Sequence, residues 1–464
     1  MKKIICLLLF FLTANFAFAQ SENYQKAIEA FEKNYNSGNF EVIFNSFSPE
    51  MQQSLPLQQT NEFLQNLKNQ AGNIKNKEFV DFQQGTFAHY KTSFQNALFS
   101  VLISIDNQNK INGLFIKAYE KGTRQTINAL TAFPKDISEI IYKQSEIFPN
   151  HTQISIAVLD HHDIKFYGII KENDSLKHTN NKDKVFEIGS ITKVLTSTVL
   201  ASLVVEGKIS LDENIHRFYS IPFKDNVQIT FKSLANHTSG LPRLPSNLDL
   251  SDQSNPYKAY GAKELEEYLK NDILLENPIN EKYSYSNLGV GLLGYTLGLS
   301  QNTTFQNLLQ NRVLEKYGMP NTYFTSHHLN DRLVQGLNEE GKVVPNWDFD
   351  VLFGAGGILS TVNDLSKFAL AAFDDANKEL TLTKIPTFNV NENMKIGLGW
   401  HILKTGYSEE IYWHNGGTGG YSSSISLDIK NKKGIIILSN ISAFNPNSGK
   451  IQELGFELLE MIEK

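Results

Sequence analysis

The sequence predicts a two-domain protein of the α/β (α+β) class, in which a small α+β domain precedes a larger domain with a sheet flanked by helices. The 464-residue chain has room for two or three domains, and its 41% hydrophobic content is enough for at least one large core. Residues 20–120 are polar and combine helical and strand patterns. Residues 135–464 carry strand patterns near both ends and helical patterns between them. Strands near both ends of residues 135–464, with helices between them, indicate a sheet assembled from distant parts of the chain.

The composition excludes several classes of protein. Charged residues make up 20% of the chain, which is ordinary for a globular protein and unlike a disordered one. The net charge of −6 argues against a nucleic-acid-binding protein, which would show a basic stripe. There is a single cysteine, and no Cys/His cluster has zinc spacing, so we expect no internal disulfide, no metal site and no cofactor.

Residues 1–19 have the pattern of a secretory signal. A basic start precedes the apolar run 4–12, and Ala17-Phe18-Ala19 is a small-x-small exit. The run is too short for a stable membrane span, and the alternative interpretation is an apolar N-terminal strand. We therefore expect cleavage near Ala19 and a periplasmic or secreted protein. Cys6 lies in the segment that is removed, so it cannot serve as a nucleophile in the mature protein.

Residues 20–120 predict a small α+β accessory domain. Ala27, Phe31 and Tyr35 recur every four residues, as on one face of a helix that ends near Gly38. Two strand-like runs, 94–106 and 111–118, follow. This order resembles the cone-shaped, NTF2-like accessory domains of exported bacterial proteins. No residue in it suggests catalysis.

A linker is expected at residues 120–133, and a larger domain follows at 135–464. Its first elements are a helix and a strand pair, and its last are three strands and a closing helix. The expected ranges are 137–148 for the first helix, 153–159 and 164–170 for the strand pair, 410–413, 422–429 and 434–438 for the later strands, and 451–462 for the closing helix.

The sharpest local motif is Ser190-x-x-Lys193, at the start of a predicted apolar helix that ends before Gly207. Residues three apart share one face of a helical turn, and a helix N-terminus favours developing negative charge. A lysine buried there is biased toward its neutral form and can accept a proton from the serine. The alternative is a serine that caps the helix and a lysine that extends to the surface, because this short motif is common by chance.

Two further segments carry candidate site residues. Tyr285 can act as a phenolic acid or base, and Asn287 can donate its amide to a substrate carbonyl. In the segment that follows the strand 410–413, His414 precedes Gly416 and Gly417, where an N–H can face an oxyanion. The alternatives are a tyrosine-rich strand end and a glycine-rich turn with an incidental histidine.

Three motifs follow one another in this sequence: Ser190-x-x-Lys193, Tyr285-x-Asn287 and His414-x-Gly416. Their order and spacing resemble those of the serine β-lactamase and penicillin-binding-protein superfamily. The resemblance is to its class C-like branch, which includes esterases, D-amino-acid peptidases and D,D-carboxypeptidases. It extends over residues 135–464 through the segments 234–242, 355–365 and 397–400. It implies a β-lactamase/transpeptidase-like fold, with an antiparallel sheet flanked by helices and a mainly helical subdomain.

The resemblance implies acyl transfer through a covalent serine ester. Ser190 would be the nucleophile, and Lys193 and Tyr285 would move the proton. Asn287 would orient the substrate, and the N–H groups of Ser190 and Gly417 would hold the oxyanion. The substrate-binding set it implies is Asn287, His414, Gly416 and Gly417.

One residue departs from the family pattern. Typical β-lactamases carry a lysine at the position of His414, and a mostly neutral histidine offers a weaker contact to a substrate carboxylate. Branch members with this histidine are often esterases or peptidases, so β-lactamase activity is not the first expectation.

The function predicted from the sequence is an exported serine hydrolase for amide or ester bonds in D-amino-acid peptides, esters or β-lactam-like compounds. Its partners would be small molecules or peptides, cell-wall peptides among them. The alternative is a non-catalytic protein that binds peptidoglycan fragments or peptides on the same fold. Specificity would lie in loops such as 243–260.

Overall fold

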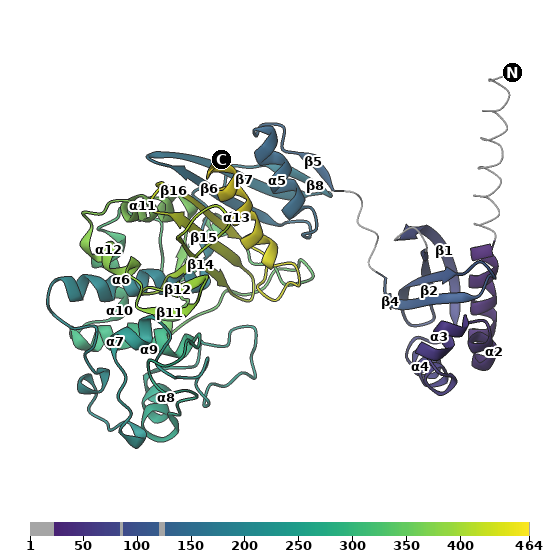
Figure 1. The fold of residues 1–464 in the computed structure, drawn as a ribbon, viewed down its shortest axis with the longest axis horizontal. Helices are drawn as coiled ribbons and strands as arrows, with labels where there is room; N and C mark the ends of the chain where they lie inside the picture. The colour runs from purple at the N-terminus through teal and green to yellow at the C-terminus, as the bar shows by residue number, and fades with distance from the viewer. Residues whose placement is uncertain (1–22, 84–86, 120–125, 464) are drawn as a thin grey trace. The chain divides into compact units, whose positions relative to one another are not determined.

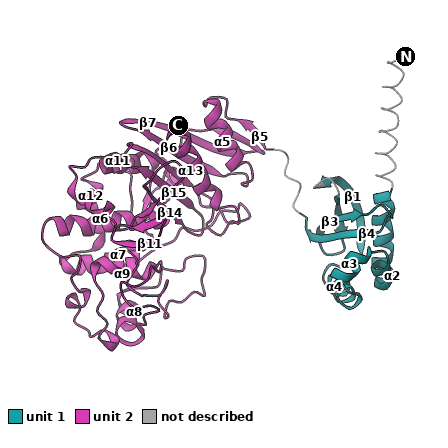
Figure 2. Cartoon of the chain, in the orientation of Figure 1, with its two compact units in different colours: residues 1–124 teal, residues 125–464 magenta. Residues whose placement is uncertain are grey.

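The computed structural model describes residues 23–83, 87–119 and 126–463. The chain divides into two compact units, residues 1–124 and 125–464 (Figure 2). The predicted signal segment lies outside the described residues. Over the ranges that are described, no helix is long and apolar enough to span a membrane.

The first unit is a small α+β fold, as predicted. Helices come first and a four-stranded antiparallel sheet of order β1-β2-β3-β4 follows. Its elements are a helix over 23–37, α2 (Phe40–Asn45), α3 (Pro49–Ser54), α4 (Leu57–Ala71), β1 (Ile74–Gln83), β2 (Phe87–Phe94), β3 (Leu98–Ile105) and β4 (Ile111–Ala118).

The sequence located the first helix of this unit correctly but missed half of its sheet. Phe31 and Tyr35 are buried together with Tyr24 and Ile28, so one face of the helix packs on the core. The predicted strand 94–106 joins the end of β2 to β3 across a short turn. β1 was missed because four consecutive polar residues, 75–78, interrupt the alternation that marks a strand.

The second unit is built on a ten-stranded sheet of order β11-β12-β13-β14-β15-β16-β6-β7-β8-β5 (Figure 1). Every neighbouring pair is antiparallel except β5 and β8. The strands are β5 (Ile127–Ala129), β6 (Gln153–Asp160), β7 (Asp163–Glu172), β8 (Ser175–His178), β11 (Phe388–Asn391), β12 (Met394–Ile396), β13 (His401–Leu403), β14 (Ile411–Gly417), β15 (Ser422–Asp428) and β16 (Lys433–Ser439). The predicted pairing of distant strands is confirmed, since β16 lies beside β6.

Both faces of the central strands are covered, which explains their continuous apolar runs. On β16, Ile435 and Ile437 pack on one face beneath α5 (Lys135–Ser145) and α13 (Gly449–Glu463). Ile436 and Leu438 alternate with them and pack into the main core on the other face. α13 closes the chain against the sheet (Figure 1).

The region between the two sets of strands is mainly helical, as predicted. Its helices are α6 (Thr192–Val205), α7 (Phe231–Ala235), α8 (Ala262–Glu267), α9 (Asn287–Ser300), α10 (Phe305–Leu309), α11 (Val362–Ala372) and α12 (Lys378–Lys384). A two-stranded ladder, β9 (Phe186–Glu187) with β10 (Leu359–Ser360), stands just before α6. α6 is buried from Thr192 to Leu203 on all sides, so it is a core helix.

Part of the expected linker belongs to the sheet. Residues 120–125 lie outside the described ranges, but Ile127–Ala129 forms β5 and pairs in parallel with β8. Thr126 donates its hydroxyl to the carbonyl of Glu146 at 2.8 Å, and Leu130 is buried. The strand has only three residues and exposed side chains, so it has no strand pattern of its own.

Candidate active site

Ser190 and Lys193 lie on one continuous helical segment. Ser190 is in a single 3₁₀ turn, Gly189–Ile191, and α6 begins at Thr192. The Lys193 Nζ lies 3.0 Å from the Ser190 Oγ. Lys193 is completely buried, and Ser190 is partly exposed and does not cap the helix. The alternative of a capping serine and a surface lysine therefore does not describe this site.

Three oxygen atoms surround the Lys193 amine. Besides the Ser190 Oγ, the Nζ contacts the Asn287 Oδ1 at 2.9 Å and the Ala355 carbonyl at 2.6 Å. Burial and the charge of Arg243 lower the pKa of Lys193 well below 10.5. A neutral amine has two N–H groups and one lone pair. It can donate to Ala355 and Asn287, whose oxygens only accept, and accept the proton of the Ser190 hydroxyl.

Tyr285 and Asn287 reach the same place from the start of α9. Ser286 caps this helix by accepting from the Gly289 N–H at 2.8 Å, which fixes the residues on either side. The Tyr285 ring centre lies 4.9 Å from the Lys193 Nζ. Burial raises the pKa of Tyr285 to about 12, and its hydrogen bond with Ser190 acts in the opposite direction. Tyr285 is therefore a protonated phenol at neutral pH.

Glycines allow strand β14 to approach the nucleophile. Gly189 has φ +50°, and a Cβ there would lie 2.5 Å from the Gly417 N. A Cβ on Gly416 would lie 2.0 Å from the Ile188 carbonyl oxygen. Both positions therefore require glycine, because any side chain would push the backbone around Gly417 away from Ser190. β14 extends to Gly417, so Gly416 and Gly417 lie in the strand and not in a turn after it.

His414 is fully buried on β14. Its Nδ1 lies 2.6 Å from the Asn415 carbonyl, and its Nε2 has no hydrogen-bond partner among the described residues. Burial and the charges of His401 and Lys193 lower the pKa of His414 well below 6.5. It is therefore a neutral ring with no exposed surface to offer an anion.

The site contains residues that the sequence patterns did not reveal. Tyr257 accepts the Asn287 amide at 3.0 Å, and the Tyr283 hydroxyl lies 2.8 Å from the His401 Nε2. The His401 ring centre is 5.1 Å from that of His414. These contacts join separate segments, and only the position of Tyr257 in the loop 243–260 hinted at a role.

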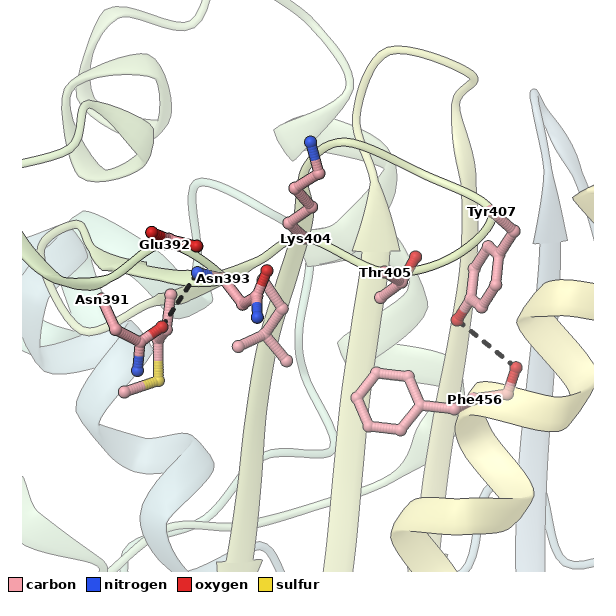
Figure 3. A pocket seen from close by; sticks show the side chains of 9 residues that line it. Asn391, Glu392, Asn393, Lys404, Thr405, Tyr407 and Phe456 are labelled. Atoms are coloured by element: carbon pink, nitrogen blue, oxygen red, sulfur yellow. Dashed lines mark hydrogen bonds between the residues drawn. The ribbon is translucent and has the colours of Figure 1, made fainter.

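A hollow of about 680 Å³ lies at the edge strands β11, β12 and β13 (Figure 3). Its lining includes Glu392, Lys404, Tyr407 and Phe456, and none of the predicted site residues. The Tyr407 hydroxyl donates to the Phe456 carbonyl at 3.5 Å. The lining holds no paired nucleophile and base like Ser190 and Lys193.

Comparisons with known sequences agree with this arrangement. The sequence model of the Beta-lactamase family matches residues 153–459, and that of a protein family of unknown function (DUF3887) matches residues 29–114. Beta-lactamase-like protein 2 of Dictyostelium discoideum is 29% identical over 51% of this chain and 45% of its own length. The D-alanyl-D-alanine-carboxypeptidase/endopeptidase AmpH of Escherichia coli K12 is 24% identical over 66% of this chain and 85% of its own.

Solved structures share the fold of the second unit. A beta-lactamase/D-alanine carboxypeptidase from Pseudomonas syringae superposes with a TM-score of 0.59 at 22% identity, covering 70% of this chain and 99% of its own. A class C beta-lactamase gives a TM-score of 0.59 at 18% identity, covering 71% and 97%. The chain spans only 45% and 53% of the first two curated relatives it matches. Because the family model covers residues 153–459, about two thirds of the sequence, the chain belongs to the beta-lactamase family.

Proposed function

We propose that the protein is a serine hydrolase that forms an acyl ester on Ser190 during cleavage of amide or ester bonds. The observation that carries the proposal is the Lys193 amine, which is buried and placed 3.0 Å from the Ser190 hydroxyl. Two acceptor oxygens take its N–H groups and leave its lone pair for the serine proton. Candidate substrates are D-amino-acid peptides, simple esters and β-lactam-like compounds.

In the first step the Ser190 Oγ attacks the carbonyl carbon and its proton passes to Lys193. The lowered pKa of Lys193 and the raised pKa of Tyr285 favour the amine as base and the phenol as acid. The carbonyl oxygen takes the negative charge, and the N–H groups of Ser190 and Gly417 are the donors proposed to stabilise it. The bond to the leaving group then breaks, and that group receives a proton through Tyr285.

In the second step a water molecule attacks the acyl ester. Lys193 and Tyr285 accept its proton and return one to the Ser190 Oγ as the acid product leaves. Asn287 orients Lys193, from which its Oδ1 accepts, and its Nδ2 donates one N–H to Tyr257 and keeps the second for the substrate carbonyl.

Turnover of a small panel tests the proposal: a 4-nitrophenyl ester, a chromogenic cephalosporin and a D-Ala-D-Ala peptide. We expect hydrolysis of at least one substrate and its loss in Ser190→Ala. Hydrolysis that persists unchanged in Ser190→Ala would contradict the nucleophile assignment. Absence of turnover and of covalent label would favour a non-catalytic peptide-binding protein on this fold.

We also propose that the protein is exported to the periplasm or beyond, on the strength of residues 1–19. N-terminal sequencing of protein from cell fractions tests this. A chain that begins at Gln20 in the periplasmic or secreted fraction supports export, and an uncleaved chain found only inside the cell contradicts it.

A further inference from the structure

Arg243 places an exposed cation beside the proposed active site. Its guanidinium carbon lies 5.3 Å from the centre of the Tyr285 ring, whose distance to the Lys193 Nζ is 4.9 Å. The residue itself is exposed, whereas Lys193 is fully buried. Of these two basic side chains near Tyr285, only Arg243 can contact a group that arrives from solvent.

Hydrogen bonds hold the main chain of Arg243 in place. Its carbonyl oxygen accepts from the N–H groups of Asn287 at 3.0 Å and Leu288 at 3.1 Å. The Ser286 hydroxyl donates to the neighbouring Pro242 carbonyl at 2.6 Å. The Arg243 side chain therefore starts from a fixed point next to Asn287, which is proposed to orient the substrate.

The guanidinium of Arg243 has no hydrogen-bond or ion-pair partner within the described residues, although it carries five N–H donors. The other three described arginines each donate to a side-chain oxygen: Arg217 to Glu213, Arg312 to Glu206 and Arg332 to Asn321. A planar fork of donors that is left free beside a reactive serine suits a bidentate contact with a carboxylate.

The surrounding charges also favour an anionic ligand. The positive charge of Arg243 lowers the pKa of Lys193, and no described carboxylate contributes to the pKa shift of Lys193 or Tyr285. His414 is buried and neutral, so it offers no cation to a ligand. An anionic group beside the Tyr285 ring would therefore meet the charge of Arg243.

We propose that Arg243 binds a carboxylate of the substrate and makes the enzyme prefer anionic esters or amides to neutral ones. This inference rests on the proposed hydrolase function and adds a substrate class to it. The competing explanation is that Arg243 acts only through its charge on Lys193. That explanation predicts the same loss of rate for every substrate, because Lys193 takes part in every turnover.

Matched ester pairs distinguish the two explanations in the full-length protein. One pair carries the charge in the acyl half: mono-4-nitrophenyl adipate and its methyl ester. The other carries it in the leaving group: 4-acetoxybenzoate and its methyl ester. Values of kcat/KM are compared for the natural protein, Arg243→Gln, Arg243→Lys and the control Arg217→Gln, which removes the same charge at a distant ion pair.

We expect the natural protein to prefer the anionic member of at least one pair. Arg243→Gln should lower kcat/KM for that member by about 10- to 100-fold, because a hydrogen bond to a charged group is lost, and change the neutral member by less than about threefold. Arg243→Lys should keep part of the preference, and Arg217→Gln all of it. Added salt should weaken the preference, since Arg243 is exposed.

Equal losses for the charged and neutral esters in Arg243→Gln would overturn the proposal and leave Arg243 as a modulator of Lys193. The absence of any preference in the natural protein would overturn it as well. Both results leave hydrolysis intact, so they differ from failure of the proposed function, in which none of the four esters is hydrolysed and Ser190 is not acylated.

Discussion

Each of the two units contains a lysine that lies close to a tyrosine ring, yet only one of these lysines has the surroundings of a catalytic base. In the first unit the Lys68 Nζ lies 5.8 Å from the Tyr35 ring centre and contacts the carbonyls of Tyr35 and Asn36 at 3.0 and 2.7 Å. Carbonyl oxygens only accept, so a charged ammonium satisfies both. Lys193 has a third contact, to the Ser190 hydroxyl, which can donate. The lysine proposed as the base is therefore the one with a partner that can donate a proton to its lone pair.

The largest effect on the rate is expected when Lys193 is replaced. Lys193→Met removes the base and should lower kcat/KM by about 10³-fold or more, within the range known for general-base catalysis. Steady-state kinetics on a neutral ester measures this. Lys68→Met is the matched control: it should leave kcat/KM unchanged and lower the free energy of unfolding by about 1–2 kcal/mol. Equal kinetic effects of the two variants would contradict the distinction.

The next largest effect on the rate is expected at β14, which approaches Ser190 closely. Gly416→Ala introduces a Cβ 2.0 Å from the Ile188 carbonyl and should displace the Gly417 N–H. We expect kcat to fall by about 10²-fold, the usual result of losing one oxyanion donor. Gly406→Ala is the control, because nothing lies within 4 Å of its Cβ. Full activity of folded Gly416→Ala would exclude this role for the strand.

A buried carboxyl group near the nucleophile should affect stability more than rate. Glu187 is 4% exposed and accepts from the Trp347 N–H at 2.9 Å and the Asn346 amide at 2.7 Å. Burial raises the pKa of Glu187 from 4.5 to about 7. The folded chain therefore binds the proton more tightly than the unfolded chain, and the free energy of unfolding falls as the pH rises from 4.5 through 7.

Glu187→Gln should remove this pH dependence. Each pH unit of pKa shift is equivalent to about 1.4 kcal/mol, so we expect the natural protein to lose about 3 kcal/mol relative to the variant between pH 4 and pH 8. Denaturant unfolding at a series of pH values measures the difference. If the free energy of unfolding of the two proteins changes with pH in the same way, Glu187 ionises in the folded state without loss of stability.

The pH dependence of the rate should show a graded effect. Because the pKa of Lys193 is lowered, its amine loses the proton well below pH 10.5, and kcat/KM should rise about tenfold per pH unit up to that pKa and then level off. The pKa of Tyr285, raised to about 12, keeps the phenol protonated across this range. A profile that falls between pH 8 and 10 would contradict this assignment of base and acid.

Local patterns in the sequence were enough to predict the helix that carries Ser190 and Lys193, since residues three apart on a helix must share a face. They were also enough for β6, β7 and β16, which contain apolar runs, and for β15, in which Ile425 and Leu427 alternate with polar residues. Spacing alone could not bring Tyr285, Asn287 and Gly417 to Ser190, and these expectations came from the ordered motifs of the family.

The remaining contacts could not be predicted because they join distant segments through loops. The Ala355 carbonyl reaches Lys193 from 162 positions further along the chain, and a backbone oxygen leaves no mark in a sequence. Strands β1 and β5 were missed because polar residues interrupt the former and the latter has three residues. Burial of His414 was not foreseen either, because the polarity of a histidine does not reveal how deeply it is packed.

Acylation of Ser190 is tested most directly by intact-protein and peptide mass spectrometry. The protein is treated briefly with a fluorescent penicillin and, separately, with a fluorophosphonate. We expect one covalent adduct with at least one reagent, located on Ser190, absent in Ser190→Ala and formed more slowly in Lys193→Met than in Lys68→Met. An adduct on another residue, or equal labelling of Ser190→Ala, would contradict it.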